Sequence, residues 1–172
     1  MMRKLLTKEG YEKLKDELRY LTRERRPEVT EIVSWAASLG DRSENADYKE
    51  NKRLLRQIDR RIRHLTKLLE VAECIEYNHV QEDKVFFGAW CELINDNDET
   101  LSFRIVGDEE VFWRKDYISL SSPMAKCCLG KRVDDEVVVH TPLGVKIWYI
   151  VRIEYKKDNS ALLMGLPRSR TL

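Results

Sequence analysis

A largely apolar set of positions recurs every three or four residues along the first half of the chain. In the first stretch these positions are Tyr11, Leu14, Leu18, Leu21, Arg25, Glu28, Ile32, Trp35 and Leu39. In the second they are Tyr48, Asn51, Leu55, Ile58, Ile62, Leu65, Leu69 and Ala72. Alternating spacings of three and four predict two long helices that pack along a coiled-coil seam. Beside Pro27 we expect a kink or brief break, because proline lacks an amide donor.

A short acidic segment separates the two predicted helices. It reads Gly40-Asp41-Arg42-Ser43-Glu44-Asn45-Ala46-Asp47. Two long helices joined by so short a loop must fold back antiparallel. At 1.5 Å per residue, roughly 30 residues give an arm on the order of 45 Å. We therefore predict an antiparallel coiled-coil hairpin over residues 1–77, with its tip at residues 40–47. Its length is easier to explain as reach than as stability.

The second half changes to β-rich runs of valine, isoleucine and aromatic residues. The runs are Val85–Ile94, Leu101–Val106, Glu136–His140 and Val145–Tyr155. Turn clusters at 95–98 and 141–144 join neighbouring runs as hairpins, and Ser122-Pro123 is typical of the start of a short helix. These patterns predict a small antiparallel sheet domain over residues 78–156, followed by a loosely ordered tail over residues 157–172. The fold class is α+β.

Composition narrows the class of protein. The 172 residues are 42% hydrophobic and 35% charged, and no apolar stretch approaches the roughly 20 residues of a membrane span. We expect a cytoplasmic protein with no membrane partner. Residues 1–75 hold 18 basic and 14 acidic residues, whereas residues 76–172 hold 13 and 16, which suggests two modules facing different partners. The four cysteines form no CxxC pair, so we expect buried thiols rather than a zinc site.

Asp41 and Glu44 admit two interpretations. As exposed carboxylates at the apex they suit Mg²⁺, although two oxygen donors are too few for a site of their own. Alternatively, Asp-x-x-Glu at the start of a helix is a capping box. The two interpretations are compatible if one carboxylate caps the helix and the other stays free.

Basic residues follow the tip along the second helix. Those nearest the tip are Lys49, Lys52, Arg53, Arg56, Arg60 and Arg63, with Lys67 further on. Most are separated by three or four residues and therefore share one helix face. Such a stripe fits a nucleic-acid backbone, or it is a solvated flank that pairs with Glu24, Glu28 and Glu31 on the first helix.

Several separated motifs resemble the bacterial Gre transcript-cleavage factors. They are residues 40–48 and 57–61 in the hairpin, and 84–90, 103–107, 114–119 and 122–125 in the second half. Arg42-Ser43 and Asp116-Tyr117-Ile118-Ser119 favour the GreB type. The resemblance covers about residues 3–155. Glu50, inside the basic stretch, departs from the pattern and puts RNA contact there in doubt.

The resemblance implies a fold, a partner and a role for each motif. The second domain would be FKBP-like and would dock at the rim of the secondary channel of RNA polymerase, which the coiled coil enters. Asp41 and Glu44 match the acidic pair that helps hold a Mg²⁺ ion of the polymerase active centre, and the isolated protein would bind none. The basic residues match a patch that contacts the 3′ segment of nascent RNA. The protein would be a monomeric accessory factor, inert without polymerase.

Three other functions stay open. A non-cleaving binder of the same channel is the nearest, although such relatives tend to alter the tip acids that this chain keeps. A peptidyl-prolyl isomerase is suggested only by the fold of the second domain, and fold does not imply function. An RNA-binding arm unrelated to polymerase explains the basic stripe but gives the acids no task.

Overall fold

The computed structural model describes residues 3–155, so the predicted tail at 157–172 lies outside the described residues. The chain divides into two compact units. One contains Lys8–Cys74, and the other contains Leu5–Thr7 and the described residues from Ile75 onward. Helices make up the first unit and a sheet with a short helix makes up most of the second, which confirms the α+β class.

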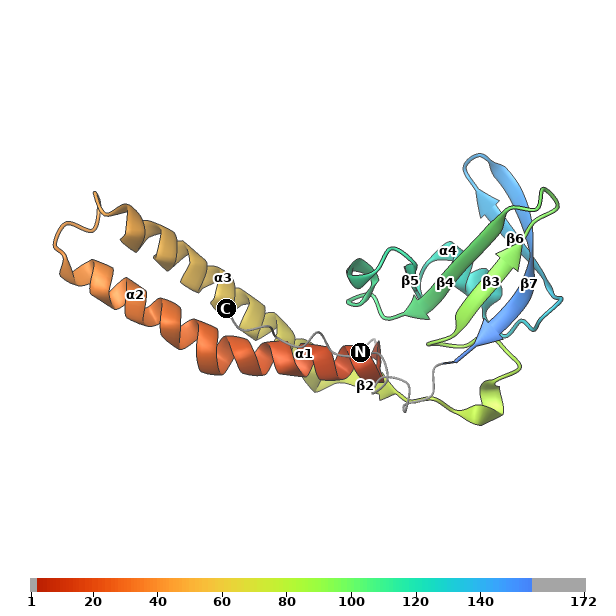
Figure 1. Ribbon diagram of the computed structural model, residues 1–172, viewed down its shortest axis with the longest axis horizontal. Coiled ribbons are helices and arrows are strands. Elements are labelled where there is room, and N and C mark those ends of the chain that lie inside the picture. The colour runs from red at the N-terminus through yellow and green to blue at the C-terminus, as the bar shows by residue number, and fades with distance from the viewer. Residues whose placement is uncertain (1–2, 156–172) are drawn as a thin grey trace, which may run out of the picture. The chain divides into compact units, whose positions relative to one another are not determined.

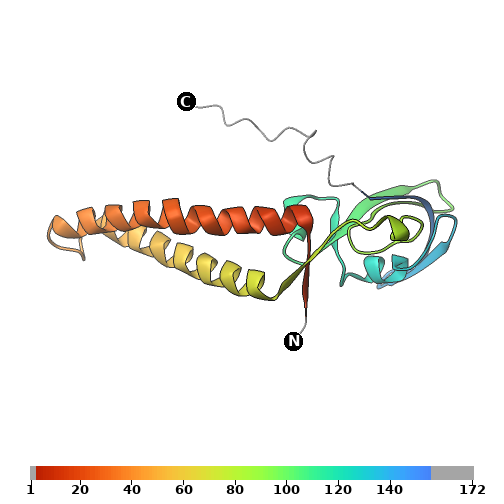
Figure 2. The ribbon, with the colours of Figure 1, turned by 90° about the horizontal axis from the view of Figure 1, so that it is seen from below.

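The first unit is a helical hairpin. Helices α1 (Lys8–Tyr20) and α2 (Arg26–Ser38) are joined by a π-helical turn at Leu21–Arg25, and α3 (Ala46–Val71) returns antiparallel to them. Figures 1 and 2 show the two arms side by side, joined at one end by the tip loop. No helix among residues 3–155 has the length and apolar character needed to cross a membrane.

A kink or a brief break was expected beside Pro27, and the break is wrong because the first arm stays helical past that residue. The irregularity takes the form of the π-helical turn, in which the amide of Arg26 bonds to the carbonyl of Leu21. A π turn holds one more residue than an α turn, which shifts every later side chain around the helix. The buried positions of α2 are accordingly Val29 and Ala36 instead of the predicted Glu28 and Trp35. Trp35 is 57% exposed and Leu39 60% exposed, so both predictions of a seam position were wrong.

The return helix follows its predicted pattern more closely, since nothing interrupts it. Ile58 and Leu65 are buried as expected, and Leu68 is buried next to the predicted Leu69. The helix ends at Val71, where the chain becomes extended as strand β2 (Ala72–Ile75). Strand β2 forms a two-stranded sheet with β1 (Lys4–Thr7), which the sequence pattern did not predict.

The second unit is built on a five-stranded sheet with the order β5-β4-β3-β7-β6. The strands are β3 (Trp90–Ile94), β4 (Thr100–Val106), β5 (Tyr117–Ser119), β6 (Glu136–Thr141) and β7 (Gly144–Glu154), and helix α4 spans Pro123–Cys128. Hairpins pair β3 with β4 and β6 with β7, as predicted. The sheet is mixed rather than wholly antiparallel, because β5 pairs parallel to β4.

The core of this unit lies between the sheet and helix α4. Leu93, Ile105, Val137 and Ile150 are fully buried there. Cys91 and Cys128 are buried thiols, and burial raises the pKa of each to about 12. At neutral pH both are protonated, so their role is packing, as the sequence predicted for them. Cys74 and Cys127 are only half-buried.

Glu110 is a buried carboxylate that holds the segment Leu5–Thr7 in this unit. It is 1% exposed. It accepts hydrogen bonds from the amides of Thr7 (3.0 Å) and Gly107 (2.9 Å), and the Thr7 hydroxyl also donates to it. Space around it is tight, because a Cβ on Gly107 would lie 2.1 Å from the carbonyl oxygen of Leu5. A carboxylate is the acceptor that can serve three donors at once.

We expect Glu110→Ala to destabilise the protein by roughly 2–6 kcal/mol, because two buried amides lose their acceptor at about 1–3 kcal/mol each. The measurement is urea unfolding of the full chain. Glu136→Ala is the matched control, since Glu136 is an exposed acid on strand β6. Equal midpoints for the two variants would show that the hydrogen bonds to Glu110 contribute no net stability.

Candidate functional site

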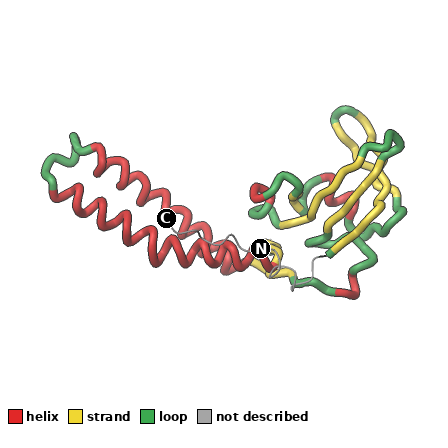
Figure 3. Tube along the Cα trace, viewed as in Figure 1, coloured by secondary structure: helices red, strands yellow, loops and turns green. Residues whose placement is uncertain are grey.

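The tip is a short loop between the ends of α2 and α3, drawn in green between two red helices in Figure 3. Helix α2 ends at Ser38, and Leu39 keeps a helical conformation with its amide bonded to the carbonyl of Ala36. Gly40 follows with a φ of +114°, which side chains rarely tolerate. The glycine therefore turns the chain out of α2, and residues 41–45 form the apex.

Asn45, and not Asp41, is the N-cap of helix α3. Its side-chain oxygen accepts a hydrogen bond from the amide of Tyr48 at 3.0 Å. Helix α3 starts at Ala46, four residues later than a capping box beginning at Asp41 requires. The capping-box interpretation of Asp41 and Glu44 is therefore wrong, and neither carboxylate is occupied in capping.

Asp41 is fixed within the loop itself. One carboxylate oxygen, Oδ1, accepts hydrogen bonds from the amide (2.9 Å) and the hydroxyl (2.7 Å) of Ser43. The bonds from Ser43, with a weaker contribution from the amide of Glu44, lower the pKa of Asp41 below its ordinary value. Because its pKa is lowered, Asp41 stays ionised to a lower pH than an ordinary aspartate. The side chain is exposed, so it presents this charge to solvent.

Glu44 lies at the same exposed apex. Its side chain makes no hydrogen bond or ion pair with the residues that the structure describes. The loop beside it is braced by Tyr48, whose ring lies 5.7 Å from the guanidinium of Arg42 and whose hydroxyl accepts from Lys52 at 2.9 Å. The nearby cations lower the pKa of Tyr48, with the hydrogen bond from Lys52 as the largest cause.

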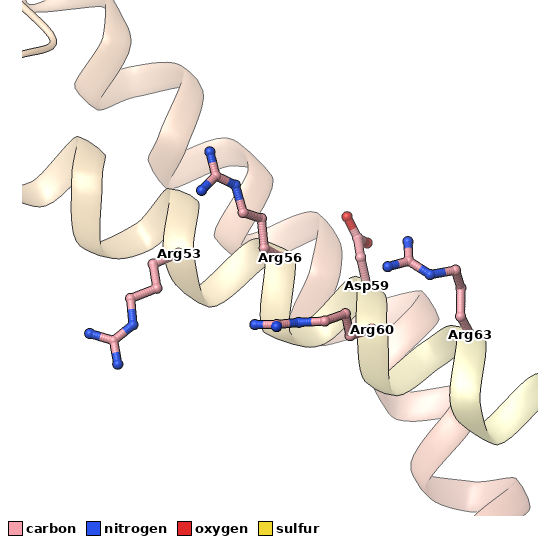
Figure 4. Close-up of a pocket in the computed structure, with 5 residues that line it drawn as sticks. All are labelled: Arg53, Arg56, Asp59, Arg60 and Arg63. Carbon is pink, nitrogen blue, oxygen red and sulfur yellow. The ribbon is translucent and has the colours of Figure 1, made fainter.

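The predicted basic residues lie along α3 in the arrangement that their spacing indicated. Lys49, Arg53, Arg56, Arg60 and Arg63 are exposed, and Lys52 is half-buried. Four of them line an open hollow of about 410 Å³, namely Arg53, Arg56, Arg60 and Arg63. Figure 4 shows their side chains projecting from α3, with Asp59 between Arg56 and Arg63, and all four arginines are exposed. We call these four arginines the arginine stripe.

The arginine stripe is not a flank paired with acids of the first arm. None of its members forms an ion pair with another residue in the described part of the chain. Of the acids expected to pair with it, Glu28 bonds to Arg25 on its own arm instead. Asp59, the one acid lining the hollow, is engaged by Arg26 at 2.7 Å, which leaves the stripe's own charge uncompensated. The bridge between arms further along is Arg61–Glu17.

Sequence reasoning missed two residues that shape the tip. Asn45 could have been found from its preference for the N-cap position, directly before Ala46 and with Asp47 in the first turn. Tyr48 was assigned to the apolar seam, whereas the structure places its ring against Arg42 and Lys52. An aromatic residue at a seam position gives no signal of such a contact.

Comparison with known proteins identifies the class to which this arrangement belongs. Residues 4–74 match the family model described as the N-terminal domain of a transcription elongation factor. Residues 80–155 match the model described as the C-terminal domain of the transcription elongation factors GreA and GreB. The chain therefore belongs to the GreA/GreB family of transcription elongation factors.

Within that family, curated relatives that match over most of the chain include factors of the GreB type. Transcription elongation factor GreB of Vibrio cholerae is 61% identical over 158 residues, which cover 91% of this chain and 98% of that protein. GreB of Pseudomonas putida is 57% identical over 90% of this chain and 96% of its own length. Among solved structures, the GreA factor homolog 1 of Thermus thermophilus is 30% identical and covers 89% of this chain and 99% of its own, with a TM-score of 0.42.

Proposed function

We propose that this protein rescues backtracked RNA polymerase by inserting its hairpin tip through the secondary channel and stimulating Mg²⁺-dependent cleavage of the 3′ RNA. The observation that carries the proposal is that both tip carboxylates are exposed and that neither caps a helix. Asp41 and Glu44 are exposed on a loop whose helix is capped by a third residue, Asn45. Membership of the GreA/GreB family supports the same conclusion.

The donors at the tip suit a shared metal site better than a complete one. Hard carboxylate oxygens are the ligands that Mg²⁺ prefers, but it requires six in near-octahedral geometry. Asp41 offers the oxygen that Ser43 does not occupy, and Glu44 offers its carboxylate. Bound Mg²⁺ supplies a water of lowered pKa and neutralises charge on the phosphate. The role of this chain is to lend two oriented anionic ligands to an active centre that belongs to polymerase.

The arginine stripe gives the proposed mechanism a second element. Backtracking extrudes the 3′ segment of the RNA, and phosphate contacts provide most of the affinity for a nucleic-acid backbone. Arg53, Arg56, Arg60 and Arg63 present uncompensated charge on the helix that starts at the tip. They would hold the extruded strand, with Lys49 and Lys52 nearest the apex, while the acids act at the scissile phosphodiester.

In this proposal the second unit docks at the rim of the secondary channel. Cleavage then takes place in the complex with polymerase and not on this protein alone. The protein by itself would then be an inert, monomeric accessory factor that binds no metal of its own. Its place of action would be the cytoplasm, where bacterial polymerase works.

The test is a backtracked elongation complex whose RNA is labelled at its 3′ end. We expect the wild-type protein to release short 3′ fragments in the presence of Mg²⁺ and to release none from the same RNA without polymerase. The released fragments are resolved on a denaturing gel and followed over time.

A different result would select among the other functions. Binding to polymerase without release of RNA would favour a non-cleaving channel regulator. Binding to free RNA with no affinity for polymerase would favour an independent RNA-binding arm. Turnover of a proline peptide would be the evidence for isomerase activity of the second unit.

A further inference from the structure

Asn45 makes two hydrogen bonds that join opposite sides of the tip. Its side-chain oxygen accepts from the amide of Tyr48 at 3.0 Å, which caps helix α3. Its side-chain NH₂ group donates to the carbonyl of Ala36, in helix α2, at 2.9 Å. One amide side chain therefore ties the end of the first arm to the start of the second.

The loop between these two anchors carries both acids. Ala36 is buried against the hairpin, at 1% exposure, so its carbonyl is a fixed point. Residues 41–44 lie in the span that the bond between Asn45 and Ala36 closes. Asp41 is braced by Ser43 within that span, whereas Glu44 directly precedes Asn45 and has no side-chain partner among the described residues. The position of the Glu44 backbone consequently depends on where Asn45 is held.

We infer that Asn45 is a positioning residue, whose cross-arm hydrogen bond to Ala36 holds the two tip acids in the geometry that metal-assisted cleavage needs. The inference rests on the proposed function, since it concerns how the acids act there. Its physical basis is pre-organisation, because a displacement of about 1 Å at a reacting centre can reduce a rate by a factor of 10².

We call the hydrogen bond from Asn45 to the Ala36 carbonyl the clamp. The substitution Asn45→Asp removes the clamp and keeps the N-cap bond from Tyr48. Aspartate is as good an N-cap as asparagine, so the bond from the Tyr48 amide is retained. An ionised carboxylate has no proton to donate, so the bond to the Ala36 carbonyl is lost. The substitution also adds a negative charge at the apex. If charge alone governed the site, the added acid would lower the Mg²⁺ concentration needed for cleavage, whereas loss of the clamp raises it.

The first experiment measures cleavage of a backtracked complex over a range of Mg²⁺ concentrations. For Asn45→Asp we expect the half-saturating Mg²⁺ concentration to rise, and the rate at limiting Mg²⁺ to fall on the order of 10-fold to 100-fold. Affinity for polymerase, measured by competition with the labelled wild-type protein, should change little. A wild-type Mg²⁺ requirement, or a lower one, would overturn the inference.

The second experiment needs no polymerase and uses amide hydrogen exchange of the free protein followed by NMR. In Asn45→Asp the Tyr48 amide should remain protected while the amides of Ser43 and Glu44 exchange faster. Unchanged exchange at Ser43 and Glu44 would show that the clamp does not order the loop. If wild-type protein releases no RNA, the proposed function fails, and this exchange pattern still decides whether the clamp exists.

The matched control is Asn78→Asp. Asn78 also caps a helical turn with its side-chain oxygen, which accepts from the amide of Val80 at 3.0 Å. Because it lies in the second unit, its substitution repeats the chemical change away from the tip. We expect its Mg²⁺ requirement to equal that of the wild type. An equal increase in the Mg²⁺ requirement of both variants would assign the effect to general instability and overturn the inference.

Discussion

Substitution of Asp41 by asparagine is expected to reduce release of 3′ RNA from a backtracked complex by about 100-fold or more while leaving polymerase binding almost unchanged. The change preserves shape, and the asparagine oxygen can still accept both hydrogen bonds from Ser43. What it removes is the negative charge of a metal ligand. Removal of one pre-organised electrostatic group at a reacting centre typically costs about 10²–10³ in rate.

Glu44→Gln should act in the same way, and the two readouts are fragment release and competition for polymerase. Glu50→Gln is the matched control, because Glu50 is an exposed acid on the same hairpin, in the second turn of α3. Cleavage at the wild-type rate by either tip variant would exclude a metal role for that carboxylate. If a tip variant lost both its affinity for polymerase and its cleavage activity, the acids would instead be docking residues.

The expected loss of activity is specific because neither tip acid caps a helix, and the hydrogen bonds that Asp41 accepts from Ser43 are kept by asparagine. Asn45 caps helix α3, Gly40 provides the turn out of α2, and Arg42 packs on the ring of Tyr48. A loop with its own bracing can expose charged groups that contribute little to folding. The tip thus differs from an ordinary helical hairpin in that residues other than the two acids brace its loop.

The sequence predicted the two-helix hairpin and the sheet domain because hydrophobic periodicity is a strong signal over long segments. It did not predict which residues of α2 are buried. The π-helical turn at Leu21–Arg25 moves the seam by one residue, to Val29 and Ala36. Seam spacings reveal a regular repeat but not the point at which a helix absorbs an extra residue.

The candidate site was predicted in part, for a similar reason. Spacing alone placed the arginine stripe on one face of α3, since that depends only on helix geometry. It placed the helix cap at Asp41 instead of Asn45, because aspartate and asparagine both favour the N-cap position and the capping-box pattern pointed to the earlier residue. The hydrogen bonds between Glu110 and Thr7 could not be predicted from sequence patterns, because they join residues 103 positions apart.

The double reversal Arg56→Glu/Arg60→Glu tests the other half of the mechanism. Both residues line the open hollow on α3 and have no ion pair among the described residues, so the change should leave the hairpin folded. Each reversal replaces an attraction for phosphate by a repulsion. We expect rescue of complexes with long extruded RNA to fall first, and complexes backtracked by a short distance to be cleaved nearly as by the wild type.

Salt dependence gives this prediction a second, independent readout. The binding constant of a protein for a single strand falls as salt is added, with a slope of log K against log salt of about −0.7 for each phosphate that the protein neutralises. The variant neutralises fewer phosphates of a long extruded RNA, so its activity on such RNA should depend less steeply on salt. Lys15→Glu/Arg23→Glu is the matched control, since it makes the same charge change at exposed positions of the first arm. An equal loss of rescue in the control would show that the effect comes from the net charge of the protein and not from the arginine stripe. A wild-type dependence on RNA length would remove the arginine stripe from the mechanism.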